Sequence, residues 1–248
     1  MIGIFKRFWP HMLCAVVALG LWDTPVIKPF RFFMVMIHEL CHAAAALISG
    51  GEVAEIRTHW NESGYTMSRG GLVPLISSAG YVGAAFLGAF TIYVGSWPAV
   101  QRAIMGMIGC VVLWMTFLYT PVMGLDFVFG MLSGAVLIGI AAQMPRASRW
   151  TATLLGVMLC LYSLHDFRTD LWMNTANTDA GILADYWGIP LLAYPIALSW
   201  ALVSVVAMFL AMRGVDRRGR KAEQATQKPA GATGTDSGGG PLQGVADR

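Results

Sequence analysis

The sequence has little charge for its length. Lys, Arg, Asp and Glu make up 12% of its 248 residues, whereas a typical soluble domain has about 25%. Together with 56% hydrophobic residues, this scarcity excludes a soluble globular domain of ordinary composition. The formal net charge is only +3, and neither a basic stripe nor a nucleic-acid-binding motif is present. We therefore expect an integral membrane protein that is surrounded by the lipid bilayer and binds no nucleic acid.

Cysteine is scarce, and no two cysteines are closely spaced. The four cysteines lie in apolar runs without a Cys-x-x-Cys motif, at Cys14, Cys41, Cys110 and Cys160. A disulfide framework is therefore not expected. The first 22 residues resemble a signal peptide, but they lack a clear small-x-small cleavage site and a second apolar run follows at once. We expect this stretch to remain as the first membrane span.

Long apolar runs make up most of the chain. A helix needs about 20 apolar residues to cross a bilayer. Seven stretches approach this length, namely 9–27, 30–49, 71–95, 101–120, 122–143, 149–165 and 189–212. They predict an all-α polytopic protein of the cell (inner) membrane with about six or seven transmembrane helices. The fourth and fifth stretches can also form one broken unit around Pro121. The sequence alone gives no oligomeric state.

Polar segments interrupt and follow these runs. Residues 52–69 alternate between polar and apolar on either side of the turn signal "NESG", which predicts a short membrane-associated β-hairpin. The acidic segment 166–188 predicts a short interfacial helix. Residues 214–248 are rich in Gly, Ala and charge, cannot bury a core, and are expected to be a disordered tail. Residues 1–213 then form one transmembrane domain.

The positions of Lys and Arg give conflicting orientations. An odd number of spans places the two chain ends on opposite faces of the membrane. The basic tail from Arg213 onward favours the cytoplasm for its own face and the outside for the hairpin, but Lys6 and Arg7 favour the cytoplasm for the other face. Seven spans therefore leave the orientation unsettled.

The second apolar run contains the motif HELCH, which is a match to HExxH. Residues four apart share one face of a helix, so His38 and His42 can bind one metal ion through their imidazoles. Glu39 points about 100° away, where it can hold and deprotonate a water without being a ligand. Zinc is the expected ion because it suits imidazole and keeps an open position for water. Ionisable groups are costly inside a membrane, and a shared metal ion satisfies all three.

A catalytic zinc normally has three protein ligands, so one must come from elsewhere in the chain. We favour Asp126, a carboxylate in an apolar stretch just beyond Pro121. Four further candidates lie in polar or interfacial surroundings that need no metal to explain them, namely His59, His165, Asp166 and Asp179.

Three stretches, in order, resemble the site-2 protease family of intramembrane zinc metalloproteases, especially its small bacterial HExxH branch. "MIHELCHAAAALISGG" resembles the zinc-binding helix, and "GLVPLISSAGYVGAAFLG" resembles the core helix that follows. "LYTPVMGLDFVFG" keeps the spacing of the Asn-Leu-Leu-Pro-x-x-x-Leu-Asp-Gly element that brings the third ligand. The resemblance covers about residues 30–140.

The resemblance implies that His38, His42 and Asp126 bind Zn²⁺ and that Glu39 is the general base. The family asparagine that steadies the substrate or the oxyanion falls on Leu118, so that role is unfilled. Members of this branch also often carry a Ser-Asp-Ala-like motif, which "NTDAGILA" around Asp179 fits, and an acidic residue near the end of the next-to-last span, which Asp166 fits. These two aspartates remain alternatives to Asp126.

The expected function is hydrolysis of membrane-protein or peptide substrates in or near the bilayer by a zinc-activated water. The missing asparagine supports an alternative, a degenerate protease that binds zinc and escorts membrane helices without cleaving them. A transporter is a third class, but the sequence has no inverted repeat and no matched pair of broken helices.

Overall fold

The computed structural model describes residues 2–95, 97–173 and 178–227. Over these residues the chain is mainly helical, with one two-stranded sheet. The elements in chain order are α1 (Ile2–Gly20), α2 (Lys28–Ile48), β1 (Glu52–Thr58), β2 (Gly64–Arg69), α3 (Val73–Ser78), η1 (Ala79–Gly83), α4 (Ala84–Val94), α5 (Pro98–Tyr119), α6 (Leu125–Gln143), α7 (Pro145–Met173), α8 (Asp179–Tyr186), η3 (Pro190–Leu192) and α9 (Ala193–Gln227).

The predicted fold class, an all-α polytopic membrane protein, is confirmed. Within the described ranges, five helical segments are long and apolar enough to cross a membrane, namely Lys28–Ile48, Val73–Val94, Pro98–Tyr119, Leu125–Gln143 and Pro190–Lys221. The predicted stretches 9–27 and 149–165 overlap α1 and α7, which are not among these five. The fourth and fifth predicted stretches form two separate helices, α5 and α6, joined at Pro121.

Helix boundaries follow the prolines of the sequence. Proline has no amide hydrogen to lose at the first turn of a helix, and its fixed φ suits that position. Pro29, Pro74 and Pro98 stand in the first turns of α2, α3 and α5, and α7 begins at Pro145. These prolines therefore set where four helices start.

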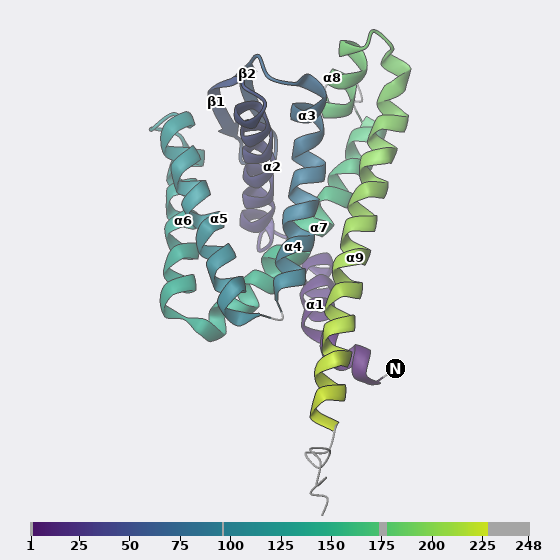
Figure 1. Ribbon diagram of the computed structural model, residues 1–248. Coiled ribbons are helices and arrows are strands. Elements are labelled where there is room, and N and C mark those ends of the chain that lie inside the picture. The colour runs from purple at the N-terminus through teal and green to yellow at the C-terminus, as the bar shows by residue number, and fades with distance from the viewer. Residues whose placement is uncertain (1, 96, 174–177, 228–248) are drawn as a thin grey trace, which may run out of the picture.

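The β-hairpin forms where it is predicted. β1 and β2 pair antiparallel from Glu52 opposite Arg69 to Thr58 opposite Gly64, with an irregularity after Val53. The hairpin lies along α2. Near the hairpin turn, the rings of Phe32 and Trp60 are in contact, with centroids 5.3 Å apart. Figure 1 shows α2 beside the hairpin, between the α5–α6 pair and the column of α3 and α4.

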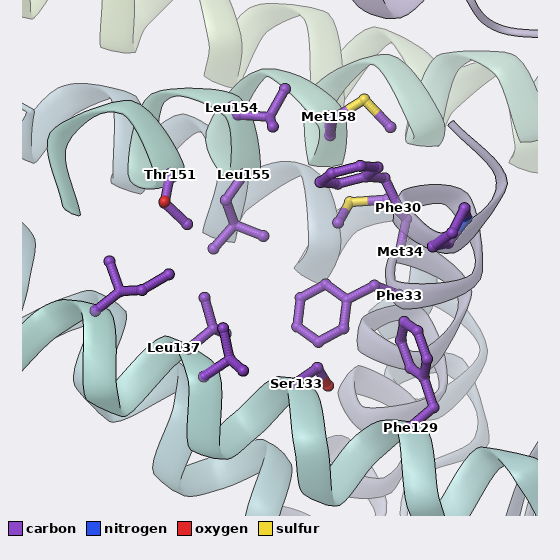
Figure 2. A pocket seen from close by; sticks show the side chains of 13 residues that line it. Phe30, Phe33, Met34, Phe129, Ser133, Leu137, Thr151, Leu154, Leu155 and Met158 are labelled. Atoms are coloured by element: carbon purple, nitrogen blue, oxygen red, sulfur yellow. The ribbon is translucent and has the colours of Figure 1, made fainter. Parts of the chain in front are cut away.

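Helix α2 forms the centre of the core. Most of its side chains are buried, and Phe32, Met34 and Ala43 are almost completely enclosed. An apolar cavity of about 370 Å³ remains between α2, α6 and α7. Figure 2 shows Phe33 of α2, Leu137 of α6 and Leu155 of α7 around it. This cavity is lined almost entirely by apolar side chains.

The two ends of the described chain lie together. Arg7 of α1 forms ion pairs with Asp216 and Glu223 of α9, and Figure 1 shows the N-terminus beside the later part of α9. Helix α1 and the later turns of α9 therefore lie at the same end of the molecule, whereas seven spans would place the chain ends on opposite faces. Residues 214–227, predicted to be disordered, continue α9 as a helix, whereas residues 228–248 lie outside the described residues.

Candidate metal centre

The two histidines of the HELCH motif point to the same place. His38 and His42 lie one helical turn apart on α2 and are both more than 90% buried. Their rings meet edge to face, with centroids 4.7 Å apart. The periodicity of a regular helix therefore brings the two imidazoles together, as the sequence predicts.

A carboxylate completes this cluster, and it belongs to Asp179. The Oδ2 atom of Asp179 lies 3.0 Å from Nε2 of His38 and 3.1 Å from Nε2 of His42. Asp179 is the first residue of α8, which Thr178 caps by accepting a hydrogen bond from the Gly181 amide. The cap fixes the start of α8 and so places the carboxylate over α2.

The three donor atoms suit a tetrahedral metal ion. Ligands at 2.0–2.1 Å from zinc are about 3.3 Å apart in a tetrahedron, close to the two measured separations of 3.0 and 3.1 Å. The ligand atoms of His38, His42 and Asp179 all lie within 4.8 Å of one another. Nδ1 of His42 donates a hydrogen bond to the Ile76 carbonyl at 2.6 Å, which leaves the Nε2 lone pair free for a metal.

The electrostatics of the cluster also favour a cation. Burial alone would raise the pKa of the Asp179 carboxyl. The His42 and His38 imidazoles that face it have the opposite and larger effect, so the pKa lies well below its ordinary range. Asp179 is therefore ionised at neutral pH. When both imidazoles are neutral, as metal binding requires, the site offers one negative charge and two nitrogen donors, a set that zinc binds well.

A glycine lines the other side of the histidines. A Cβ atom at Gly80 would collide with Nε2 of both His38 and His42, so any larger residue would fill the space in front of the donor atoms. Gly80 belongs to the π-helical turn η1, a distortion that is frequent at functional sites. The Tyr81 ring then packs edge-on against His38, with centroids 4.8 Å apart. The sequence contains the glycine at position 80 but has no pattern that predicts the π-turn.

Glu39 lies beside the cluster but outside it. Its side chain is 5% exposed and lies under strand β2, where the Thr66 hydroxyl is 2.9 Å from both the Glu39 carbonyl oxygen and its Oε2. A Cβ atom at Gly64 would be only 2.6 Å from Oε1 of Glu39. The hairpin thus holds the carboxylate from one side, within electrostatic range of both histidines.

The structure corrects the expected position of Asp126. This residue is 2% exposed, and its Oδ2 accepts hydrogen bonds from Nε of Arg57 at 2.8 Å and from the Thr58 amide at 3.3 Å. Its Oδ1 accepts a hydrogen bond from the Phe127 amide in the first turn of α6. An arginine is always charged, so it neutralises the buried carboxylate without a metal. Asp126 therefore joins the hairpin to α6, and Asp179 stands where Asp126 was predicted.

The other candidates from the sequence lie elsewhere. His59 packs near Tyr65 on the hairpin, and the His165 ring lies 4.8 Å from that of Trp22. The side chain of Asp166 falls outside the described residues. Leu118, which occupies the position of the family asparagine, is 47% exposed on α5. The motif "NTDAGILA" is therefore the sequence signal that marked the carboxylate of this site.

The chain matches a known protein family. A family model described as Peptidase M50B-like covers residues 11–211, a range that includes His38, His42 and Asp179. No curated protein and no solved structure matches the chain.

Proposed function

The chain belongs to the Peptidase M50B-like family, and on that premise we propose that it is an intramembrane zinc metalloprotease. Its substrates are membrane proteins or peptides, which it cleaves in or near the bilayer of the cell (inner) membrane. We assign zinc binding to His38, His42 and Asp179, and the general base to Glu39.

The observation that carries this proposal is the meeting of three donor atoms beside a glutamate. Asp179 comes from a helix 141 residues away in sequence, yet its Oδ2 lies within 3.1 Å of Nε2 of both histidines. A single oxygen of Asp179 faces both imidazoles, and because Nδ1 of His42 already donates to the Ile76 carbonyl, a neutral His42 has no second hydrogen to donate to Asp179. Such convergence is typical of a metal site.

When bound, zinc would polarise the scissile carbonyl and lower the pKa of a water molecule. Glu39 would accept a proton from the attacking water and return it to the leaving amine. Thr66 would keep the Glu39 carboxylate in one orientation through the contact at 2.9 Å. A substrate helix must unwind before cleavage, and an edge of the β1–β2 sheet can pair with the freed backbone.

One observation favours a second candidate, a zinc-binding membrane protein without catalytic activity. The family asparagine is replaced by Leu118, whose side chain is 47% exposed and cannot hydrogen-bond a substrate. Such a protein would bind membrane helices at the same site and leave them intact.

A single substitution separates the two candidates. Membranes containing the wild-type chain or Glu39→Gln should be compared by mass spectrometry of their membrane proteins. A protease predicts that intact substrates accumulate with Glu39→Gln, because cleavage falls by about 10³-fold or more when proton transfer is lost. The zinc content should not change. Glu52→Gln, the same change at an exposed position of β1, is the matched control and should behave as wild type. Identical fragments from wild type and Glu39→Gln would favour the non-catalytic candidate.

A further inference from the structure

A second cavity lies at the other end of the molecule from the metal centre. It has a volume of about 480 Å³ and is enclosed by the first turns of α5 and α7, the end of α4, and parts of α1 and α9. Figure 1 shows these segments below the hairpin and α8, near the N-terminus. Unlike the apolar cavity beside α2, this one is lined by several polar side chains.

Two residues that line this space carry polar atoms without hydrogen-bond partners among the described residues. Gln101 is only 3% exposed and lines the cavity, yet its side-chain amide takes part in none of the hydrogen bonds among the described residues. Nδ1 of His11, another lining residue, is buried and likewise has no partner within the described structure. A buried polar group without a partner costs about 1–3 kcal/mol. The unpartnered Gln101 amide therefore favours a polar ligand in this cavity.

The charge around the cavity selects an anion. Arg149 lines the cavity and forms no ion pair with any described residue, whereas Arg7 is already paired with Asp216 and Glu223. Gln101 and Arg149 stand near the N-terminal ends of α5 and α7, whose dipoles add positive potential there. One free guanidinium, one amide and two helix ends suit a single phosphate group.

The cavity also lies at the level expected for lipid headgroups. The span Val73–Val94 ends beside it and the span Pro98–Tyr119 begins there. The indole rings of Trp9 and Trp150, both lining residues, meet edge to face at 5.5 Å, and tryptophan is enriched at membrane–water interfaces.

The same end of the molecule is rich in positive charge. It carries Arg7, Arg102, Arg146 and Arg149, and the later turns of α9 add Arg213, Arg217, Arg218, Arg220 and Lys221. Basic residues favour the cytoplasmic side, where anionic lipids attract them.

We propose that this cavity binds the phosphate headgroup of one anionic phospholipid from the cytoplasmic leaflet. The Arg149 guanidinium pairs with the phosphate, and the Gln101 amide donates a hydrogen bond to it. The acyl chains stay in the surrounding bilayer. The lipid would then join α1, α5, α7 and α9 at a distance from the metal centre, independently of proteolysis.

Native mass spectrometry of the full chain tests this proposal. Delipidated protein in detergent is titrated with phosphatidylglycerol or with phosphatidylcholine of the same acyl chains. We expect one phosphatidylglycerol to be retained in preference to phosphatidylcholine. Arg149→Gln should weaken its retention about tenfold, since one charge-assisted hydrogen bond is lost. Arg146→Gln removes the same charge from the same helix at an exposed position that does not line the cavity, and should have no effect.

Each other outcome overturns the proposal. Equal loss with Arg149→Gln and Arg146→Gln would mean that lipid binds the basic surface in general. No loss with either variant, or equal retention of the two lipids, would exclude a headgroup site in the cavity. Displacement of phosphatidylglycerol by an equal concentration of free glycerol phosphate would mean that the cavity takes a soluble anion. Gln101→Leu provides a second variant, which removes the amide. If its melting temperature is unchanged, misfolding is excluded as the cause of any loss of phosphatidylglycerol retention.

Discussion

Two aspartates, Asp126 and Asp179, illustrate how the partners of a carboxylate decide its role. Both stand in the first turn of a helix, where Asp126 is buried and Asp179 is partly buried. Asp126 faces Arg57, whose positive charge is permanent and occupies the carboxylate. Asp179 faces two imidazoles, which can be neutral and offer lone pairs. Only the second arrangement leaves the carboxylate available to a metal ion.

The largest effect is expected from removing both imidazoles. His38→Ala with His42→Ala leaves Asp179 alone, so zinc affinity should fall by several orders of magnitude and cleavage should cease. Elemental analysis of purified protein in detergent measures the zinc. His59→Ala, a change of the same residue type on the hairpin, should retain it. Equal zinc in the double variant and the wild type would refute the metal site.

A smaller effect is expected where the hairpin touches Glu39. Thr66→Val keeps the shape of the side chain but removes the hydroxyl that contacts Glu39. A hydrogen bond to a charged group contributes about 1.5–3 kcal/mol, so kcat should fall about 10- to 100-fold with zinc content unchanged. Thr66→Ser should restore the rate, and Ser68→Ala, an exposed residue of the same strand, should not change it. A Thr66→Val enzyme with wild-type kcat would show that Glu39 needs no support from the hairpin.

The smallest effect is expected at Asp126. Asp126→Asn weakens the link between the hairpin and α6 without touching the metal centre. Small displacements of positioning groups lower rates, and we expect about a tenfold or smaller loss of cleavage, together with a lower melting temperature. Thermal unfolding and cleavage assays measure the two effects. A loss as large as that of Glu39→Gln would mean that Asp126 takes a direct part in the reaction.

The local parts of the site could be predicted from the sequence. The i, i+4 spacing places His38 and His42 on one face because a helix repeats every 3.6 residues. The hairpin follows from its alternating pattern and its "NESG" turn. Both features depend on neighbouring residues, so no knowledge of tertiary packing was needed.

The third member of the cluster could not be predicted in this way. The apolar stretch around Asp126 predicts a ligand there, but that context indicates only that the residue is buried and needs a partner. The partner is Arg57, which lies 69 residues earlier in the chain. Asp179 reaches the histidines because α8 packs against α3 and α9, an arrangement that spacing in sequence does not reveal. The pairing of Arg7 with Asp216, which joins α1 to α9, is long-range in the same sense.

Zinc stoichiometry of Asp179→Asn and Asp126→Asn, measured side by side, tests the central claim most directly. Both substitutions keep the shape of the side chain and remove its charge. The geometry predicts about one zinc per chain in the wild type and in Asp126→Asn, and a loss of zinc from Asp179→Asn. Retention of zinc by Asp179→Asn, with loss from Asp126→Asn, would contradict the account and restore Asp126 as the third ligand.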